Sequence, residues 1–334
     1  MSSGGPSADA RPPLVSVTTP VFNGEKYLGE CIESVLAQSY DNWEYTVVDN
    51  CSTDRSLAIA SEYAAAHPRI KVIRNDQFVG AIENHNRAFR SISAEARYCK
   101  LLSADDWLYP ECIAKLVDLA ERHPSVGIVG SYATDGIGVR WGHLPLDREV
   151  FAGHEAARLY LLGKIDTFWV PSSVLYRASI VRASDQFFSR DSSSADLEAC
   201  LRSLKDSDLG FVHQILSYQR LHDDAITSRV GEVNGELLDR AKVLVEFGPE
   251  FLTPAEQRER LDEQVSEYFE VLAGESFRIR DREFWRRHRA GLHELGYSIG
   301  DRRFAKAVAA RFLDLTLNPR LTTQKVVRRV AQRH

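Results

Sequence analysis

A chain of 334 residues is about twice the ~150 residues of a typical domain, so we expect one large α/β domain with an appendage, or two domains. Hydrophobic residues make up 44% and charged residues 27%, ordinary values that exclude a disordered or fibrous chain. The net charge of -5 is unevenly spread, because residues 277–334 contain 15 Lys or Arg and 5 Asp or Glu, a balance of +10 that leaves -15 for residues 1–276. The acidic body argues against nucleic acid as a partner.

The N-terminal sequence and the cysteines of the chain indicate the cellular compartment of the protein. Residues 1–13 are mostly Ser, Gly, Ala and Pro, which predicts a disordered leader without the apolar stretch of a signal peptide. No run approaches the ~18 uncharged apolar residues of a spanning helix. The cysteines are odd in number, widely spaced and without a C-x-x-C pair, which favours reduced thiols, a cytoplasmic location and no zinc site. They are Cys31, Cys51, Cys99, Cys112 and Cys200.

Short β-branched segments alternate with helical segments through the first part of the chain. Residues 14–19 (LVSVTT) predict a strand, 20–24 (PVFNG) break it, and apolar residues at helical spacing follow from 27 to 36. The same pattern predicts further strands at 44–48, 70–73, 98–102 and 126–130. Expected helices cover 55–67, a segment ending near 91, and 110–123.

Strands that alternate with helices of this length are typical of βαβ crossovers in a parallel sheet. Ligands of such sheets bind beyond the carboxyl ends of the strands. We therefore expect the site in the loops that follow the strands. These loops span residues 20–24, 49–54, 75–80 and 103–107.

The pattern changes twice further along the chain. Residues 133–230 mix glycine, aromatic and polar residues, whereas the sequence beyond 232 is nearly all helical, with long charged stripes. We expect an α/β domain in two halves, 14–132 and 133–230. A helical domain with a basic tail is expected at 231–334.

Carboxylates follow two of the expected strands. Asp49 comes after the second strand, and the adjacent pair Asp105 and Asp106 comes after the fourth. A lone carboxylate can accept a ring N–H of a base, while a pair can hold Mg²⁺ or Mn²⁺ that bridges phosphates. No P-loop and no G-x-G-x-x-G fingerprint follows the first strand, so a nucleotide must be held in another way.

Four runs in order along about 95 residues resemble the family 2 glycosyltransferases. The resemblance implies a GT-A fold, a Rossmann-type mostly parallel sheet with flanking helices. It also implies a nucleotide-diphosphate sugar donor, a divalent cation (Mg²⁺ or Mn²⁺) and inversion at the anomeric carbon. Residues 14–132 would then bind the nucleotide sugar and 133–230 the acceptor. The runs are 16–28 (SVTTPVFNGEKYL), 34–40 (SVLAQSY), 47–54 (VVDNCSTD) and 103–108 (SADDWL).

The resemblance assigns the base and ribose to the first two loops. Thr19, Pro20 and Phe22 match the part that touches base and ribose, with Phe22 where the family often has Tyr. Asp49 matches the residue that binds the base. A carboxylate accepts the N3–H of uracil or thymine, and also the N1–H of guanine, so we expect UDP or dTDP before GDP.

The diphosphate and the sugar are assigned to the third and fourth loops. Gly80 and Asn86 fit a family spacing on the helix beneath the diphosphate and sugar. Ser103, Ala104 and Asp105 match the family's Asp-x-Asp region, with Asp105 and Asp106 as the expected metal ligands. Ser103 stands where many relatives have Asp, which removes one ligand and puts the metal dependence in question.

A later stretch, residues 187–202 (FFSRDSSSADLEACLR), is similar to the family segment that carries the catalytic base. Asp196 keeps the base position, Ala195 replaces a family Glu, and Asp191 is the reserve candidate. A carboxylate there would take the proton from the acceptor hydroxyl. His222 matches an Arg-x-His element that lies near the diphosphate in relatives.

Each candidate also has a structural interpretation. Asp49 could cap a turn, because residues 49–54 have good turn chemistry. Asp105 and Asp106 could be carboxylates favoured by a helix dipole, and Asp196 could be an N-cap. His222 could be a buried structural histidine.

The sequence therefore predicts an inverting glycosyltransferase that moves one sugar to a glycan, lipid-linked or small-molecule acceptor in polysaccharide or glycoconjugate biosynthesis. Two alternatives stay open. A sugar-phosphate nucleotidyltransferase would need a Gly-rich basic loop after the first strand, which residues 20–24 do not provide. A catalytically silent nucleotide-sugar-binding subunit would fit the departures at Ser103 and Ala195.

The basic end of the chain has no assigned partner. Val326, Val327 and Val330 lie among cations and could form an amphipathic end on the inner face of an anionic membrane. A homodimer contact through the C-terminal helices, or a solvated helical face, are the other interpretations.

Overall fold

The computed structural model describes residues 11–140, 142–167, 171–189, 192, 194–221, 235–279 and 281–317. The chain divides into two compact units, Met1–His222 and Asp223–His334. The predicted domain boundary at 230 lies outside the described residues. Each unit is considered by itself below.

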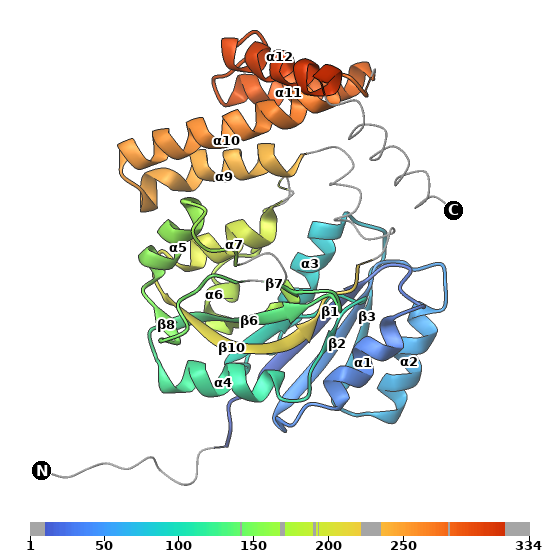
Figure 1. The fold of residues 1–334 in the computed structure, drawn as a ribbon. Coiled ribbons are helices and arrows are strands. Elements are labelled where there is room, and N and C mark those ends of the chain that lie inside the picture. The colour runs from blue at the N-terminus through green and yellow to red at the C-terminus, as the bar shows by residue number, and fades with distance from the viewer. Residues whose placement is uncertain are drawn as a thin grey trace, which may run out of the picture. The chain divides into compact units, whose positions relative to one another are not determined.

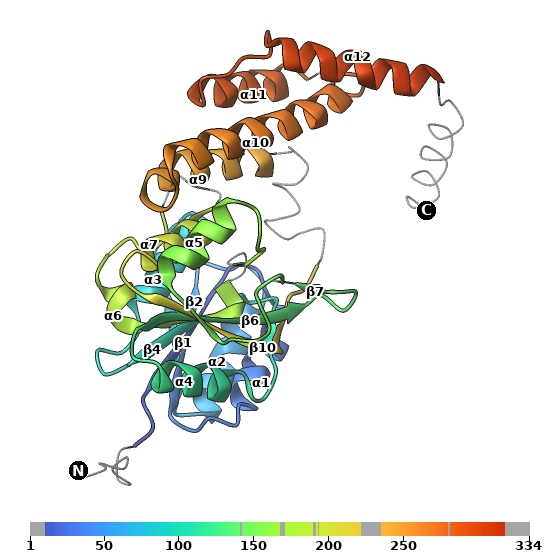
Figure 2. The ribbon, with the colours of Figure 1, turned by 60° about the vertical axis from the view of Figure 1, so that its left-hand side comes forward.

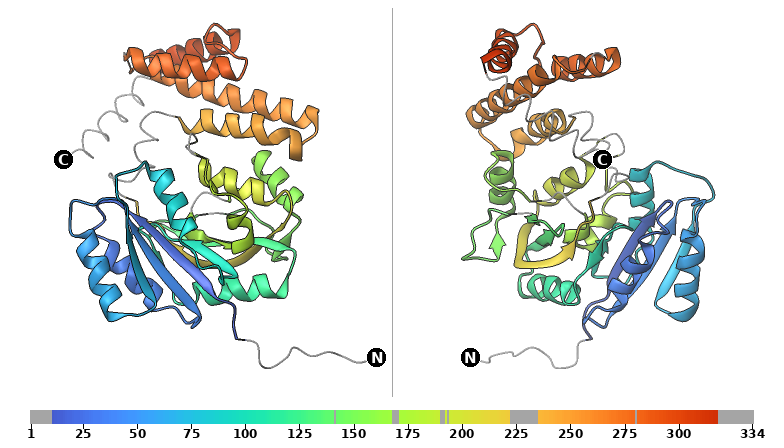
Figure 3. Two further views of the ribbon diagram at one scale, coloured as in Figure 1. Left: turned by 180° about the vertical axis from the view of Figure 1, so that it is seen from behind. Right: turned by 45° about the vertical axis from the view of Figure 1, so that its right-hand side comes forward.

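A ten-stranded sheet forms the centre of the first unit, with the order β3-β2-β1-β4-β9-β6-β10-β5. Strands β1, β2, β3 and β4 pair in parallel, and so do β6 and β10. Figure 3 shows the strands of the N-terminal half, in blue, side by side. The strands are β1 (Val15–Val21), β2 (Trp43–Asp49), β3 (Ile70–Arg74), β4 (Tyr98–Leu101), β5 (Trp107–Leu108), β6 (Val126–Thr134), β7 (Val139–Arg140), β8 (Val150–Phe151), β9 (Val174–Arg177) and β10 (Asp208–Tyr218).

Helices cover both faces of this sheet (Figure 1). Helices α1, α2 and α4 lie on one face, and α3, α5, α6 and α7 lie on the other, as the turned view of Figure 2 also shows. The predicted α/β class with a mostly parallel sheet is confirmed. The helices are α1 (Leu28–Leu36), α2 (Ser56–Ala66), α3 (Ala81–Arg90), α4 (Cys112–Arg122), α5 (Gly153–Leu161), α6 (Ala178–Arg182) and α7 (Ala195–Ser203), with a 3₁₀ turn η1 at Pro171–Ser173.

Strand β1 is central and every one of its residues is buried. It pairs with β2 on one side and with β4 on the other, so both of its edges and both of its faces are covered. Burial on both faces explains why its sequence is a continuous β-branched run rather than an alternating one. The loops that follow β1, β2 and β4 therefore begin at one edge of the sheet.

Strand β1 continues two residues beyond its predicted end, so Pro20 lies in a strand and not in the loop as expected. Strand β4 pairs with β1 only as far as Thr18, opposite Leu101. Pro20 therefore lies where β1 has lost one neighbour, and its missing N–H breaks no ladder hydrogen bond on that side. A proline is tolerated in a strand at such a position.

Strand β9 interrupts the parallel part of the sheet, because it lies between β4 and β6 and is antiparallel to both. Three short strands are also antiparallel: β5 and β8 pair with β10, and β7 pairs with β6. The short turn η1 immediately precedes β9, so it lies close to the fourth loop of the site. Trp107, expected in that loop, lies in the short strand β5.

The described part of the second unit is helical, as predicted. Helix α10 begins with a capping box in which Thr253 and Glu256 exchange hydrogen bonds, followed by Pro254 at the first helical position. Side chains such as Tyr268, Phe269 and Leu272 are buried in its core. Its helices are α9 (Glu236–Phe251), α10 (Pro254–Glu275), α11 (Arg282–Glu294) and α12 (Arg302–Leu317).

Among the described residues, no helix has the length and the apolar composition needed to span a bilayer.

Candidate active site

Asp49 lies at the last position of β2, and its side chain is fully buried. Its carboxylate accepts a long hydrogen bond from the N–H of Ser52, at 3.2 Å for the nearer oxygen. The guanidinium of Arg74 lies 3.8 Å from the same oxygen. The contact with Ser52 is the turn chemistry expected for residues 49–54, and the arginine supplies the compensating charge.

The loops after β1 and β2 are joined to each other. Asn23 accepts a hydrogen bond from the N–H of Thr53 at 2.8 Å, and the hydroxyl of Ser52 accepts one from the N–H of Asn23 at 3.0 Å. Asn23 and Cys51 both have positive φ, 52° and 59°. Left-handed backbone at non-glycine residues persists only where the surroundings hold it, and such positions cluster at functional sites.

The Thr19 side chain points away from the loops. Its hydroxyl accepts a hydrogen bond from the Tyr45 hydroxyl at 2.8 Å and contacts the Cys31 sulfur at 3.8 Å, all within the core. Burial raises the pKa of the Cys31 thiol to about 12, so it remains a neutral core group. The whole of Thr19, backbone included, is buried.

Two exposed phenylalanines meet beyond the sheet edge. Phe22 follows β1 and is 48% exposed, and Phe78 lies in the loop after β3 and is 60% exposed. Their rings form an edge-to-face pair with centroids 4.9 Å apart. The sequence analysis singled out Phe22 and missed Phe78, because nothing in the third loop predicts that its aromatic residue meets the first loop.

A network of buried amides fixes the third loop. Asn75 donates from its side-chain nitrogen to the side-chain oxygens of Asn50 and Asn84, at 3.0 Å and 2.9 Å. Asn50 also accepts from the Val79 N–H at 3.0 Å. The loop that leads to Gly80 is therefore held to β2 and to α3.

Gly80 is the N-cap of α3, with φ -61° and ψ 156°, values that any residue can adopt. A Cβ at this position would meet no protein atom within 4 Å. The fold does not require glycine here, so the residue leaves open space at a helix N-terminus, where an anion is favoured.

Asn86 performs a different task from the one expected. Its side-chain amide is buried and makes two hydrogen bonds of 2.8 Å with the backbone of Phe188, donating to the carbonyl and accepting from the N–H. It thus ties α3 to the segment before α7. The adjacent His85 packs against the ring of Phe188, with centroids 6.0 Å apart. Burial lowers the pKa of His85, and the negative charge of Asp105 partly opposes this.

Asp106 is the most connected carboxylate of the site, and it is 4% exposed. One oxygen accepts from the Ser172 hydroxyl at 2.6 Å, and the other accepts from the Arg220 N–H at 3.0 Å. Ser172 also accepts from the N–H of Ser103 at 3.1 Å. Asp106 therefore connects three segments, the fourth loop, the turn η1 and the residues after β10.

Arg220 completes this arrangement. Its Nε donates to the carbonyl of Asp105 at 3.1 Å, and its guanidinium forms an ion pair with Glu30. The guanidinium also lies over the ring of Tyr27, 4.2 Å from the centroid, and 5.2 Å from that of Trp107. The sequence places Arg220 in the Arg-x-His element that ends at His222, but it does not predict these contacts.

Ala104 and Asp105 lie partly buried in the same loop. A Cβ built on Gly24, in the loop after β1, would be 3.6 Å from the Ala104 Cβ, so the first and fourth loops are adjacent. Burial raises the pKa of Asp106 well above its usual value, and the charge of Asp105 adds to this. Two neighbouring carboxylates that repel each other form a suitable binding site for a cation.

The donor set matches Mg²⁺ or Mn²⁺, which take carboxylate oxygens and complete their shell with phosphate and water. Among the described residues, no three His, Cys, Asp or Glu side chains group closely enough to hold a metal by themselves. A cation on this loop would therefore depend on oxygens from the ligand.

Asp196 lies in the first turn of α7 and is partly buried. Its carboxylate accepts a hydrogen bond from the N–H of Leu197 at 2.8 Å. Burial raises its pKa to about 7, with a smaller contribution from the charge of Glu198. Glu198 is itself buried, where it accepts a hydrogen bond from Ser192 and pairs with Arg202 at 3.5 Å.

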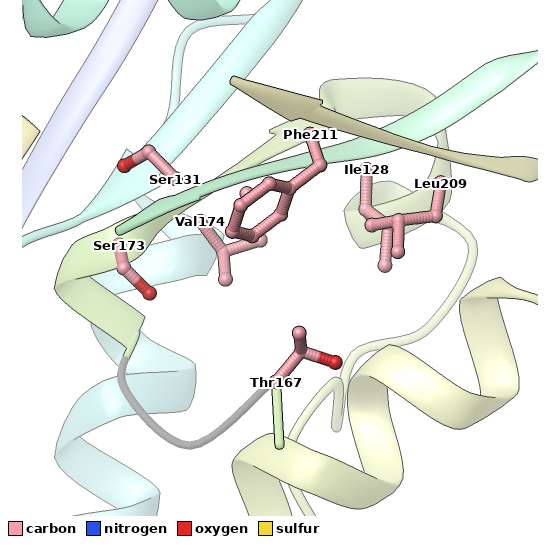
Figure 4. A pocket seen from close by; sticks show the side chains of 8 residues that line it. Ile128, Ser131, Thr167, Ser173, Val174, Leu209 and Phe211 are labelled. Atoms are coloured by element: carbon pink, nitrogen blue, oxygen red, sulfur yellow. The ribbon is translucent and has the colours of Figure 1, made fainter. Parts of the chain in front are cut away.

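A small cavity lies beside the turn η1, between β6, β9 and β10 (Figure 4). Its volume is about 10 Å³, room for about one water molecule, so it cannot hold a sugar. The buried hydroxyls of Ser131 and Thr167 line it and have no hydrogen-bond partner among the described residues. It is lined by Ile128, Gly130, Ser131, Thr167, Ser173, Val174, Leu209 and Phe211.

The structure brings most of the predicted residues to one edge of the sheet. Phe22, Asp49 and Gly80 lie on loops joined by hydrogen bonds, and Asp105 lies on the adjacent fourth loop. His222 and Asp191 lie outside the described residues. Asp196 is linked to this edge through the Phe188 segment that precedes α7.

Comparison with known proteins gives a family match. Residues 16–184 match the model described as glycosyl transferase family 2. EpsE and TuaG, two provisionally named glycosyltransferases of Bacillus subtilis (strain 168), are 38% identical over 133 residues and 34% identical over 143 residues. These matches cover 38% and 42% of this chain, and 46% and 53% of the relatives, so the chain spans about half of their length.

Solved structures share the fold. Residues 1–349 of TarS of S. aureus, in complex with UDP-GlcNAc, superpose with a TM-score of 0.64 at 19% identity, covering 84% of this chain and 80% of that fragment. The mannosyltransferase PcManGT of Pyrobaculum calidifontis, in complex with GDP-Man and Mn²⁺, gives a TM-score of 0.57 at 13% identity, covering 95% and 84%. At such identities the likeness concerns the fold alone, and it supports the predicted GT-A class.

The raised pKa of Asp196 gives a testable dependence of stability on pH. Folding raises its pKa from 3.8 to about 7, so the ionised form destabilises the native state. This cost is absent below about pH 4, grows as the pH rises and is complete above about pH 7. Asp196→Asn should therefore unfold at a higher temperature than the wild type at pH 8 and at the same temperature near pH 4. At 1.4 kcal/mol per pKa unit, the gain in free energy of unfolding at pH 8 is at most roughly 4 kcal/mol.

Thermal unfolding, followed by circular dichroism across this pH range, measures the difference in melting temperature between the variant and the wild type. Asp206→Asn, at an exposed aspartate, is the matched control and should show no such pH dependence. An Asp196→Asn protein that is less stable than the wild type at pH 8 contradicts the assignment of a raised pKa.

Proposed function

The chain belongs to the family 2 glycosyltransferases, and we propose that it is an inverting enzyme that moves one sugar from a nucleotide-diphosphate sugar to an acceptor hydroxyl. The observation that carries this proposal is the loop of Ser103 to Asp106 at the carboxyl edge of the sheet. There Asp106 is held by Ser172 and Arg220, and Asp105 lies beside it. A fixed carboxylate loop at a strand end is a suitable binding site for a diphosphate with its cation.

The nucleoside would bind at the loops after β1, β2 and β3. The exposed rings of Phe22 and Phe78 offer an apolar surface for the base, and Asp49 would accept a ring N–H. Asp49 is fully buried beside Arg74, so its carboxylate must be uncovered before a base can reach it. Thr19 and Pro20 would support the base and ribose from beneath, because both residues are buried in β1 and the Thr19 side chain is engaged in the core.

UDP or dTDP remains the favoured donor nucleotide, with GDP second. The carboxylate of Asp49 matches the ring N–H of all three. The two similar structures were determined with UDP-GlcNAc and with GDP-Man, which is compatible with either choice.

We assign the cation to Asp105 as its main protein ligand, because Asp106 is 4% exposed and each of its oxygens accepts a hydrogen bond that holds the loop. When bound, Mg²⁺ or Mn²⁺ would neutralise the charge of the departing diphosphate. Asp106 keeps the loop in place through Ser172, and Arg220 brings positive charge to the backbone of Asp105. The open N-terminus of α3 at Gly80 would accept part of the diphosphate or the sugar.

Asp196 is assigned as the general base. Its pKa of about 7 suits a group that must accept a proton from a hydroxyl near neutral pH. The two hydrogen bonds of Asn86 to Phe188 act at a distance from the chemistry, since they hold the segment that leads into α7. His222 would lie near the diphosphate.

The relatives support the proposed acceptor class, which this chain's geometry does not specify. One of them, TuaG, is named for teichuronic acid biosynthesis. We expect a glycan or lipid-linked acceptor in polysaccharide or glycoconjugate biosynthesis and a cytoplasmic site of action, with no role for nucleic acid.

The donor nucleotide can be identified by ligand-induced stabilisation. In thermal unfolding with Mn²⁺, UDP or dTDP should raise the melting temperature most, GDP less and ADP least, because adenine has no ring N–H for Asp49. The shift should fall when EDTA replaces Mn²⁺. Gly80→Ala should reduce the shift without lowering the melting temperature of the free protein, because the added Cβ meets only open space. A largest shift with ADP contradicts the role of Asp49.

The reaction is tested by donor turnover. Asp196→Asn should lower the release of nucleoside diphosphate by about 10²- to 10⁴-fold, the usual contribution of a general base, while the nucleotide-induced shift stays the same. Asp206→Asn is the control and should keep full activity.

Two results would contradict the proposal that this protein is a glycosyltransferase enzyme. Nucleotide binding without turnover on any acceptor would support the silent subunit, to which Ser103 and Ala195 point. Formation of a nucleotide sugar from a sugar phosphate and a nucleoside triphosphate would support a nucleotidyltransferase.

A further inference from the structure

The run 34–40 (SVLAQSY) is one of the four that resemble the family, yet it takes no part in the proposed binding of donor or cation. It covers the end of α1 and the residues that follow this helix. Helix α1 packs against β5, the short strand at the end of the fourth loop. The run therefore lies beside the loop that carries Asp105.

Ser34 holds the end of the fourth loop. Its hydroxyl donates to the carbonyl of Cys31 at 2.7 Å and accepts from the N–H of Leu108 at 3.1 Å. Leu108 lies two residues after Asp106, in β5, which pairs only with the end of β10 at the edge of the sheet. Ser34 thus gives this short strand a second support on the side of α1.

Gln38 joins α1 to the residues after the fourth loop. Its buried amide nitrogen donates to the carbonyls of Ser34 and Tyr109, both at 2.9 Å, and its oxygen accepts from the N–H of Ile113 at 3.0 Å. The first carbonyl lies in the last turn of α1 and this N–H in the first turn of α4, where helices leave backbone groups without partners. An amide offers both donors and an acceptor without charge, which explains a glutamine at this position.

Other residues of α1 reach the start and the middle of the loop. The Cys31 sulfur lies 3.5 Å from the carbonyl of Ser103. Arg220, which donates to the carbonyl of Asp105, forms an ion pair with Glu30. The side chain of Glu30 is 57% exposed, so this pair stabilises the arrangement only slightly. Helix α1 therefore contacts or supports the loop at its start, middle and end.

We infer that α1 fixes the loop that would carry the cation, with Ser34 and Gln38 as positioning residues for Asp105. The inference rests on the proposed function, in which Asp105 is the main protein ligand of the cation. In the part of the chain that the structure describes, no three acidic, His or Cys side chains group to hold a metal. The affinity for a cation must then depend on how firmly Asp105 is held in place, because a preorganised ligand loses less freedom on binding.

Binding of Mn²⁺ in the presence of UDP, followed by electron paramagnetic resonance, tests this inference. Ser34→Ala should bind Mn²⁺ roughly 10-fold more weakly than the wild type, the usual loss when the support of a metal ligand is removed. Gln38→Met, which removes three hydrogen bonds, should weaken it at least as much. Binding of UDP in EDTA should stay the same, whereas a merely structural role would lower the melting temperature and leave the Mn²⁺ affinity of the folded protein unchanged.

Three variants serve as controls. Ser34→Thr keeps the hydroxyl and should bind Mn²⁺ like the wild type. Ser61→Ala is the matched control, because the Ser61 hydroxyl donates to the carbonyl of Leu57 at 2.7 Å within α2, and it should have no effect. Glu30→Gln should weaken binding by at most about five-fold, the upper range for an exposed ion pair.

Hydrogen–deuterium exchange in the metal-free protein measures the loop itself. Residues 103–108 should exchange faster in Ser34→Ala than in the wild type, and at the wild-type rate in Ser61→Ala. Circular dichroism at the same temperature shows that each variant is folded.

The outcomes distinguish this inference from the proposed function. Wild-type Mn²⁺ affinity in both Ser34→Ala and Gln38→Met, or an equal loss in Ser61→Ala, would overturn the inference and leave the proposed function intact. Failure of the wild type to bind Mn²⁺ with UDP would overturn the assignment of the cation to Asp105, and the inference with it.

Discussion

The site depends on one buried carboxylate, that of Asp106. Its two oxygens accept hydrogen bonds from Ser172 and Arg220, which come from segments far apart in the sequence. A buried carboxylate without these donors would carry the full cost of desolvation. This cost favours the arrangement in which Asp106 joins the three segments. The position of Asp105, and of any cation bound to it, follows from this arrangement.

The same arrangement explains why an acidic body can bind an anionic ligand. Asp49, Asp105 and Asp106 lie at the edge of the sheet in a part of the chain with a formal charge of -15 over residues 1–276. Arg74 and Arg220 neutralise some of this charge, at Asp49 and around the fourth loop. In the proposed function, a divalent cation would neutralise further charge and offer the diphosphate a positive partner.

Much of the fold could be predicted from the sequence, because parallel strands buried on both faces have continuous β-branched runs bounded by turn residues. The positions of Asp49 and Asp105 after their strands followed from this. Contacts between loops could not be predicted: Phe78 meets Phe22 only in three dimensions, and Asn86 carries a family spacing yet holds Phe188. Pro20 was expected to end β1, but the strand continues because β4 stops short beside it.

The central claim is that Asp105 binds the cation while Asp106 holds the loops in place. Binding of Mn²⁺ in the presence of UDP, followed by the loss of the free-ion electron paramagnetic resonance signal, tests it most directly. Asp105→Asn should remove this binding. Asp106→Asn should retain it with an affinity roughly 10- to 100-fold lower, the usual loss when a residue that positions a metal ligand is replaced. Tight Mn²⁺ binding by Asp105→Asn, or its complete loss in Asp106→Asn alone, would contradict the account.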